Sequence, residues 1–166
     1  STRAVLPSMR ERRSGRILNF SSLGGYSAYA GWGIYSATKF AVEAISESMS
    51  LELEPLGIKT TIVEPGFFRT DFLSATSLFS TEVRIDDYAD TVGAMRNFAA
   101  GADHQQPGNP AKLADAILQV VDVPQPPRRL PLGSDALTRI TEKHNAVEKE
   151  VSQWRELALS TDFVVI

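Results

Sequence analysis

Helical and extended hydrophobic patterns alternate along the first half of the sequence, and this alternation limits the folds open to the chain. Apolar residues recur at helical spacing over residues 4–13 and again over residues 32–56. Each of these segments is followed by a short run of β-favouring residues, 16–20 and 58–63. Strands that alternate with helices pair in parallel through right-handed crossovers. The pattern therefore predicts an α/β protein with a parallel sheet.

The second half is irregular at first and then alternates again. Residues 67–108 show no sustained period, which predicts a mobile, partly helical excursion that acts as a lid or binding loop, with an ordinary surface connection as the alternative. Asn109 and Pro110 predict the start of a helix that ends near Asp122. Residues 128–132 are a candidate third strand. A last helix follows Gly133 and Ser134 and carries Leu137, Ile140, Val147, Val151 and Trp154, and we expect the apolar tail 163–166 to pack on a neighbour or a partner chain.

Composition is that of one globular domain. The 166 residues are 43% hydrophobic and 22% charged, which suffices for a single core. A net charge of -3 provides no field that attracts nucleic acid or an anionic membrane, so we expect neither as a partner. The absence of cysteine excludes disulfides and cysteine nucleophiles, and together with the lack of a secretory pattern it favours a cytoplasmic protein.

Tyr35 and Lys39 are candidate catalytic residues. They lie four residues apart near the start of the predicted long helix, so their side chains share one face. A free phenol has a pKa of about 10, too high for a base at neutral pH, and a nearby ammonium lowers that pKa. The pair therefore predicts a tyrosine that acts as a general acid or base.

Two serines follow the first predicted strand at its carboxyl end, which is the edge where open α/β sheets bind ligands. After Ser21 and Ser22, a glycine-rich turn lets the chain reach the helix that carries Tyr35. Ser22 could then hydrogen-bond a substrate oxygen while Tyr35 moves the proton. The alternative for Ser22 is a hydroxyl that satisfies local backbone groups.

These residues carry a resemblance to the short-chain dehydrogenase/reductase family. Ser22, thirteen residues before Tyr35, matches the catalytic serine of the family, and Tyr35 with Lys39 matches its Tyr-x-x-x-Lys motif. Pro65, Gly66 and Thr70 resemble the segment that wraps the nicotinamide end of the cofactor. In that segment, Phe68 stands where valine or isoleucine is usual.

The resemblance implies a Rossmann-like, doubly wound parallel sheet of which residues 1–166 supply the C-terminal half of a single domain. It also implies hydride transfer between NAD or NADP and a small-molecule alcohol or carbonyl compound, with Tyr35 as general acid/base. Ser22 would orient the substrate oxygen, and Lys39 would hold the nicotinamide ribose. The implied cofactor-binding residues are Tyr35, Lys39, Pro65, Gly66, Phe68 and Thr70. A homo-oligomer through the helices at 4–13 and 32–53 is implied as well.

The resemblance also divides the chain into three parts. Residues 16–70 would hold the catalytic segment, and residues 109–166 the last strand and the C-terminal helices. Residues 67–108 resemble the variable substrate loop of the family. Within that loop Phe68, Phe72, Tyr88 and Met95 predict a mostly apolar substrate.

The first βαβ units of the family are expected to be missing. Its glycine-rich turn, the residue that selects NAD or NADP and a catalytic asparagine belong to a region ahead of Ser1, so we expect a truncated chain, with a processed or trimmed form as the alternative. The glycines between Gly24 and Gly33 lack the G-x-G-x-x-G spacing that binds a pyrophosphate. The competing functional interpretations are a non-catalytic cofactor-binding or regulatory protein and an inactive fragment on the same scaffold.

The remaining candidates predict no chemistry. Glu64 has the position of a solvated or paired surface carboxylate, and His104 and His144 have no second ligand at metal spacing, so no metal site is expected. The arginines at 10, 12, 13 and 16 are interpreted as solvated charges near a helix end. We also expect the strand at 16–20 to expose one edge, because its neighbour would come from the missing half.

Overall fold

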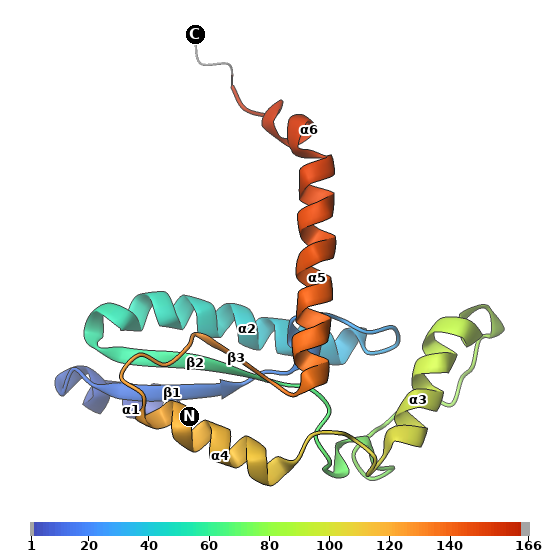
Figure 1. Cartoon of the computed structure of the whole chain (residues 1–166), viewed down its shortest axis with the longest axis horizontal. Coiled ribbons are helices and arrows are strands. Elements are labelled where there is room, and N and C mark those ends of the chain that lie inside the picture. The colour runs from blue at the N-terminus through green and yellow to red at the C-terminus, as the bar shows by residue number, and fades with distance from the viewer. Residues whose placement is uncertain (1, 164–166) are drawn as a thin grey trace.

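The computed structural model describes residues 2–163, which form a three-stranded parallel sheet with helices around it (Figure 1). The strands β1 (Gly15–Phe20), β2 (Ile58–Pro65) and β3 (Arg129–Leu132) lie in the order β1-β2-β3. Pairing runs from Gly15 with Ile58 to Phe20 with Val63. The predicted α/β class with a parallel, Rossmann-like sheet is confirmed.

Long helices flank the sheet. In Figure 1, α2 (Gly33–Leu53) lies on one side of the strands and α4 (Pro110–Asp122) lies on the other. A small core forms where Ile17, Leu53 and Ile58 meet, with α1 (Thr2–Glu11) packed against it through Leu6 and Met9. The remaining helices are α3 (Ala94–Ala102), α5 (Ser134–Gln153) and α6 (Arg155–Leu159).

Two boundaries differ from the sequence prediction because of proline. The long helix ends at Leu53 and continues as a single 3-10 turn, Glu54–Leu56, since Pro55 has no N–H to donate. Strand β2 extends to Pro65 instead of stopping at Val63. This proline is tolerated because β1 has ended at Phe20, while the ladder to β3 continues through Gly66, whose N–H donates to the carbonyl of Leu132 (2.9 Å).

The excursion at 67–108 is partly helical, as predicted. It contains two 3-10 turns, a π-helical turn (Ala89–Gly93) and α3. A bridge between Phe68 and Gly108 brings its two ends together, so the excursion leaves and rejoins the body at one place. That place is the carboxyl edge of the sheet.

The last predicted helix is divided in two. It begins at Ser134 as expected, but Trp154 leaves the helical conformation (φ -104°, ψ 11°) and separates α5 from α6. Of the predicted apolar tail, Phe163 is 99% exposed and so does not pack on the body, and residues 164–166 lie outside the described residues.

Strand β1 is an edge strand, because its outer side pairs with no strand among residues 2–163. We therefore expect the 166-residue chain, expressed alone, to self-associate in size-exclusion chromatography with light scattering. Successive residues of a strand direct their N–H groups to opposite sides. The N–H of Ser21 donates to Val63 on β2, so the N–H of Leu18, three residues earlier, points to the free edge. Leu18→Pro should reduce the association without breaking the ladder. A monodisperse wild-type monomer with a cooperative melt would contradict this expectation.

Candidate active site

A pocket of about 250 Å³ opens at the carboxyl ends of β1 and β2. Its lining comes from the end of β1, the start of α2, the segment after β2 and the excursion. It includes six of the residues singled out in the sequence: Ser22, Tyr35, Pro65, Gly66, Phe68 and Thr70. Parallel strands end at the same edge of a sheet, which is why segments so far apart in sequence meet there.

Ser22 has a local role in addition to its place in the pocket. It is the N-cap of the 3-10 turn Leu23–Gly25, and its Oγ accepts a hydrogen bond from the N–H of Gly24 (3.1 Å). The alternative noted for Ser22, a hydroxyl bound to local backbone, is therefore present. An acceptor role toward Gly24 leaves the hydroxyl proton available for donation within the pocket, to Tyr35 or to a ligand.

Tyr35 lies in the first turn of α2 and lines the same pocket. Its ring packs against Trp32 and Phe72, with centroid distances of 5.5 Å to each. Gly24 covers another part of the ring, and a Cβ there would lie only 3.1 Å from Cε1 of Tyr35. Burial raises the pKa of Tyr35 above its usual value of 10.0, while a hydrogen bond with Ser22 acts in the opposite direction.

Lys39 stays a predicted partner of Tyr35, whose pKa in this structure is shifted by burial and by the hydrogen bond with Ser22. Its Nζ donates a hydrogen bond to the main-chain oxygen of Phe20 (3.2 Å) and lies over the ring face of Tyr35, 5.9 Å from the centroid. The ammonium is thus held at the end of β1. Lys39 adjoins the pocket but is not among the residues that line it.

The segment after β2 is held in place by a residue that the sequence analysis missed. Asp135, at the start of α5, accepts a hydrogen bond from the N–H of Phe67 (2.7 Å). Gly66 is required beside it, because a Cβ at that position would collide with the Asp135 carboxylate. An acidic residue in a first helical turn was the available signal, but it indicates only a helix start.

The excursion supplies much of the pocket wall. Of the four residues expected to contact an apolar substrate, Phe68, Phe72 and Met95 line the pocket, whereas Tyr88 is 56% exposed and lies outside it. Trp32, Tyr29, Gln106 and Leu113 also line the pocket and were not singled out in the sequence.

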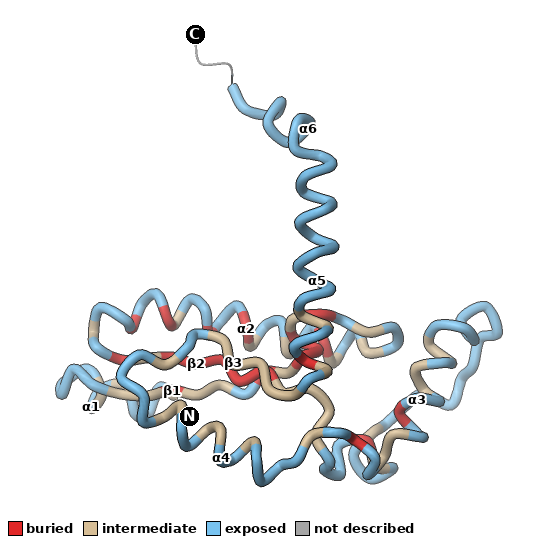
Figure 2. The backbone as a smooth tube through the Cα atoms, in the orientation of Figure 1, coloured by how far each residue is buried: buried red, intermediate tan, exposed pale blue. Residues whose placement is uncertain are grey.

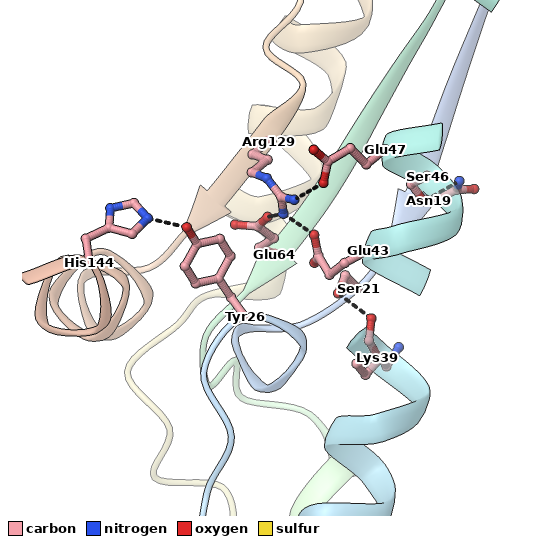
Figure 3. A network of polar contacts seen from close by, with 10 residues as sticks. All are labelled: Asn19, Ser21, Tyr26, Lys39, Glu43, Ser46, Glu47, Glu64, Arg129 and His144. Atoms are coloured by element: carbon pink, nitrogen blue, oxygen red, sulfur yellow. Dashed lines mark hydrogen bonds and ion pairs between the residues drawn. The ribbon is translucent and has the colours of Figure 1, made fainter. Parts of the chain in front are cut away.

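Glu64 is buried, which corrects the expectation of a surface carboxylate. It is 1% exposed and pairs with Arg129 (2.8 Å), which also binds Glu47 (3.0 Å) and Glu43 on α2 (Figure 3). Burial raises the pKa of Glu64 from 4.5 to about 7; the hydrogen bond from Arg129 opposes this rise, and the charge of Glu43 adds to it. This cluster ties β2, β3 and α2 together close to the pocket.

The described residues contain no group of three or more His, Cys, Asp or Glu side chains arranged to bind a metal ion. His104 lies near Asp71 (3.5 Å), and His144 contacts the hydroxyl of Tyr26. None of the helices in residues 2–163 has the length and apolar character needed to cross a membrane.

Comparison with known proteins shows what this chain is similar to. Residues 1–79 match the family model of the short chain dehydrogenases. Oxidoreductase BOA17 of Botryotinia fuckeliana (strain B05.10) is 34% identical over 160 residues, which are 96% of this chain and 58% of the relative. A solved short-chain dehydrogenase from Streptomyces avermitilis is 42% identical with a TM-score of 0.84, over 98% of this chain and 58% of that chain. The closed form of serine dehydrogenase complexed with NADP+ is 26% identical with a TM-score of 0.59, over 79% of this chain and 48% of that chain.

The parallel sheet and these matches define the class of the chain as a Rossmann-like α/β fold. Within that class, the chain belongs to the short-chain dehydrogenase/reductase family. It spans about half the length of these relatives, 58% of the first and 48% of the last.

Proposed function

We propose that the protein containing this chain interconverts an alcohol and a carbonyl compound by hydride transfer with NAD or NADP. The observation that carries the proposal is the meeting of Ser22 and Tyr35 in one pocket with the segment from Pro65 to Thr70. These are the residues on which the family resemblance rests. The cofactor supplies the hydride, and the protein positions the groups and moves the proton.

The residues present suit a nicotinamide. Gln106 lines the pocket, is 2% exposed and donates to the main-chain oxygen of Thr70 (3.3 Å), while its own Oε1 has no hydrogen-bond partner among the described residues. A buried acceptor of this kind suits the N–H donors of a carboxamide. Pro65, Gly66, Phe68 and Thr70 would hold the nicotinamide end, and Lys39 would hold the ribose. The solved relative bound to NADP+ supports a nicotinamide cofactor.

In this proposal Tyr35 donates its proton to the substrate oxygen during reduction and recovers it during oxidation. A raised pKa keeps the phenol protonated at neutral pH, which suits the donor role. Ser22 donates a hydrogen bond to the same oxygen and stabilises the charge that develops there. Trp32 and Phe72 pack against the Tyr35 ring and against each other, and this cluster of three rings fixes the position of Tyr35 in the pocket wall.

The pocket favours a neutral, largely apolar substrate. Among the described residues that line it, none is Lys, Arg, Asp or Glu, and Trp32, Phe72, Met95 and Leu113 supply apolar surface. A carboxylate bound there would lose its hydration without gaining a cationic partner.

We therefore expect the complete enzyme to reduce ethyl acetoacetate with a kcat/KM at least about tenfold higher than that for acetoacetate, which carries the same ketone beside a free carboxylate. The measurement is oxidation of NADH and NADPH in steady-state assays with each compound. A preference for acetoacetate would contradict the neutral substrate class. Failure of both cofactors to support reduction of any carbonyl compound in a broad panel would contradict the proposed function itself.

A further inference from the structure

Helix α5 projects away from the rest of the molecule. It leaves the sheet after β3 and extends outward, with α6 beyond it (Figures 1 and 2). A helix of 20 residues is about 30 Å long, and every described residue from 141 to 163 is exposed. Packing of an apolar face provides most of the stability of a helix in a folded protein, and the outer part of α5 lacks it within its own chain.

The exposed helix nevertheless carries a regular apolar seam, which we define as Leu137, Ile140, His144, Val147 and Val151. These residues alternate at steps of three and four, the spacing that places side chains along one side of a helix for packing against another. Val147 is 41% exposed and Val151 is 61% exposed. Trp154, at the end of α5, continues the same spacing and is 58% exposed.

A groove of about 560 Å³ separates this seam from the body of the protein. Its walls combine Val147 and Val151 of the seam with Phe40 of α2 and with the charged residues Glu43 and Arg129. At its base, the end nearest the start of α5, His144 contacts the hydroxyl of Tyr26 (Figure 3). The groove is thus an apolar strip with charges of both signs around it.

We propose that α5 is a dimerisation arm, and that a second copy of this chain lays its own α5 along the seam so that the free end of each arm enters the groove of the other. The charges beside the seam are self-complementary. Lys143 and Glu150 lie seven residues apart on one side of it, and Glu148 and Arg155 have the same spacing on the other. A two-fold pair of antiparallel helices therefore brings opposite charges together on both sides.

The antiparallel direction follows from the base of the groove. Tyr26 and α2 already occupy the space beside the inner part of the seam, so a second copy running in the same direction would place its body there. A segment of the same protein outside this chain is a poor candidate for filling the groove. A strand that it added to the free edge of β1 would extend the sheet away from β3, and α5 departs from β3. The solved relative from Streptomyces avermitilis aligns with nearly the whole chain, which includes α5.

The test is sedimentation equilibrium of the complete polypeptide that contains this chain. Val151→Glu should raise the dissociation constant of the assembly at least about tenfold, because a carboxylate would be buried in the apolar contact. Asn145→Glu places the same charge on the same helix away from the seam and should leave the constant within about twofold of wild type. Both positions are exposed in the single chain, so both variants should fold, as circular dichroism can verify.

A charge exchange tests the pairing itself. Lys143→Glu should weaken association, and adding Glu150→Lys should restore it, which a purely local role of Lys143 would not produce. The proposal is overturned if the wild-type protein is monomeric, if Val151→Glu and Asn145→Glu associate equally well, or if the exchange does not restore association. Loss of binding to anionic lipid vesicles in Val151→Glu, with self-association unchanged, would likewise overturn it in favour of a lipid surface.

Discussion

Tyr35→Phe in the complete enzyme is expected to lower kcat by about two to four orders of magnitude, the usual contribution of a positioned general acid or base. The substitution removes only the phenolic oxygen, so the ring keeps its packing against Trp32 and Phe72. Cofactor affinity should therefore change by no more than a few-fold. Steady-state kinetics give the loss of turnover, and fluorescence titration with NADPH or NADH gives the affinity.

Tyr88→Phe is the matched control for this experiment. Tyr88 is 56% exposed and lies outside the residues that line the pocket, so the loss of its hydroxyl should leave both kcat and cofactor affinity unchanged. Equal activity of the Tyr35 and Tyr88 variants would show that the Tyr35 hydroxyl takes no part in the proton transfer.

Arg129→Leu is expected to reduce the free energy of unfolding by roughly 3–5 kcal/mol at about pH 8, the cost typical of removing one partner from a buried ion pair. Glu64 is 1% exposed, so without Arg129 it would either keep a buried charge with no cation beside it or take up a proton, and Glu43 is 6% exposed. The expected effect is large because the remaining carboxylates are poorly solvated and repel one another. Chemical denaturation of the complete protein measures it.

The loss should be smaller at about pH 5. In the folded protein burial raises the pKa of Glu64 from 4.5 to about 7, so the folded state holds a proton that the unfolded state releases. This contribution to stability is fully present below pH 4.5 and is lost as the pH rises through about 7. Removing Arg129 raises the pKa of Glu64 further, so the variant can neutralise the carboxyl group at the lower pH.

Two further variants separate this explanation from a simple loss of packing. Adding Glu64→Gln to Arg129→Leu should recover part of the stability at about pH 8, because it removes the unpaired charge. Arg128→Leu removes an exposed neighbour whose pairing with Glu54 spans 4.0 Å, and should cost less than about 1 kcal/mol. An Arg129→Leu loss that is independent of pH, or no larger than that of Arg128→Leu, would contradict the role assigned to this cluster.

The features that the sequence predicted correctly are those set by local pattern and by parallel topology. Strand composition identified β1 and β2, and the rule that ligands bind at the carboxyl edge brought Ser22 and Tyr35 to one place with the segment after Pro65. The N-cap at Asn109 was readable because its side chain bonds to Ala111 two residues away.

The features that escaped prediction depend on partners far away in the sequence. The Lys39 ammonium is held by a main-chain oxygen at Phe20, which no side-chain motif records. The burial of Glu64 depends on Arg129, 65 residues further along the chain. The projection of α5 was equally hidden, because its apolar spacing is the same for a helix that covers a sheet and for one that reaches outward.

The central claim is that this pocket supports hydride transfer, and isotope transfer tests it most directly. The complete enzyme would be given ethyl acetoacetate with NADPH, and separately NADH, carrying deuterium at the hydride-donating carbon of the nicotinamide. The account predicts that mass spectrometry finds deuterium on the carbinol carbon of the product, and that Tyr35→Phe yields little product under the same conditions. Absence of labelled alcohol with both cofactors, from a folded protein that still binds one of them, would contradict the account and favour a non-catalytic, cofactor-binding protein.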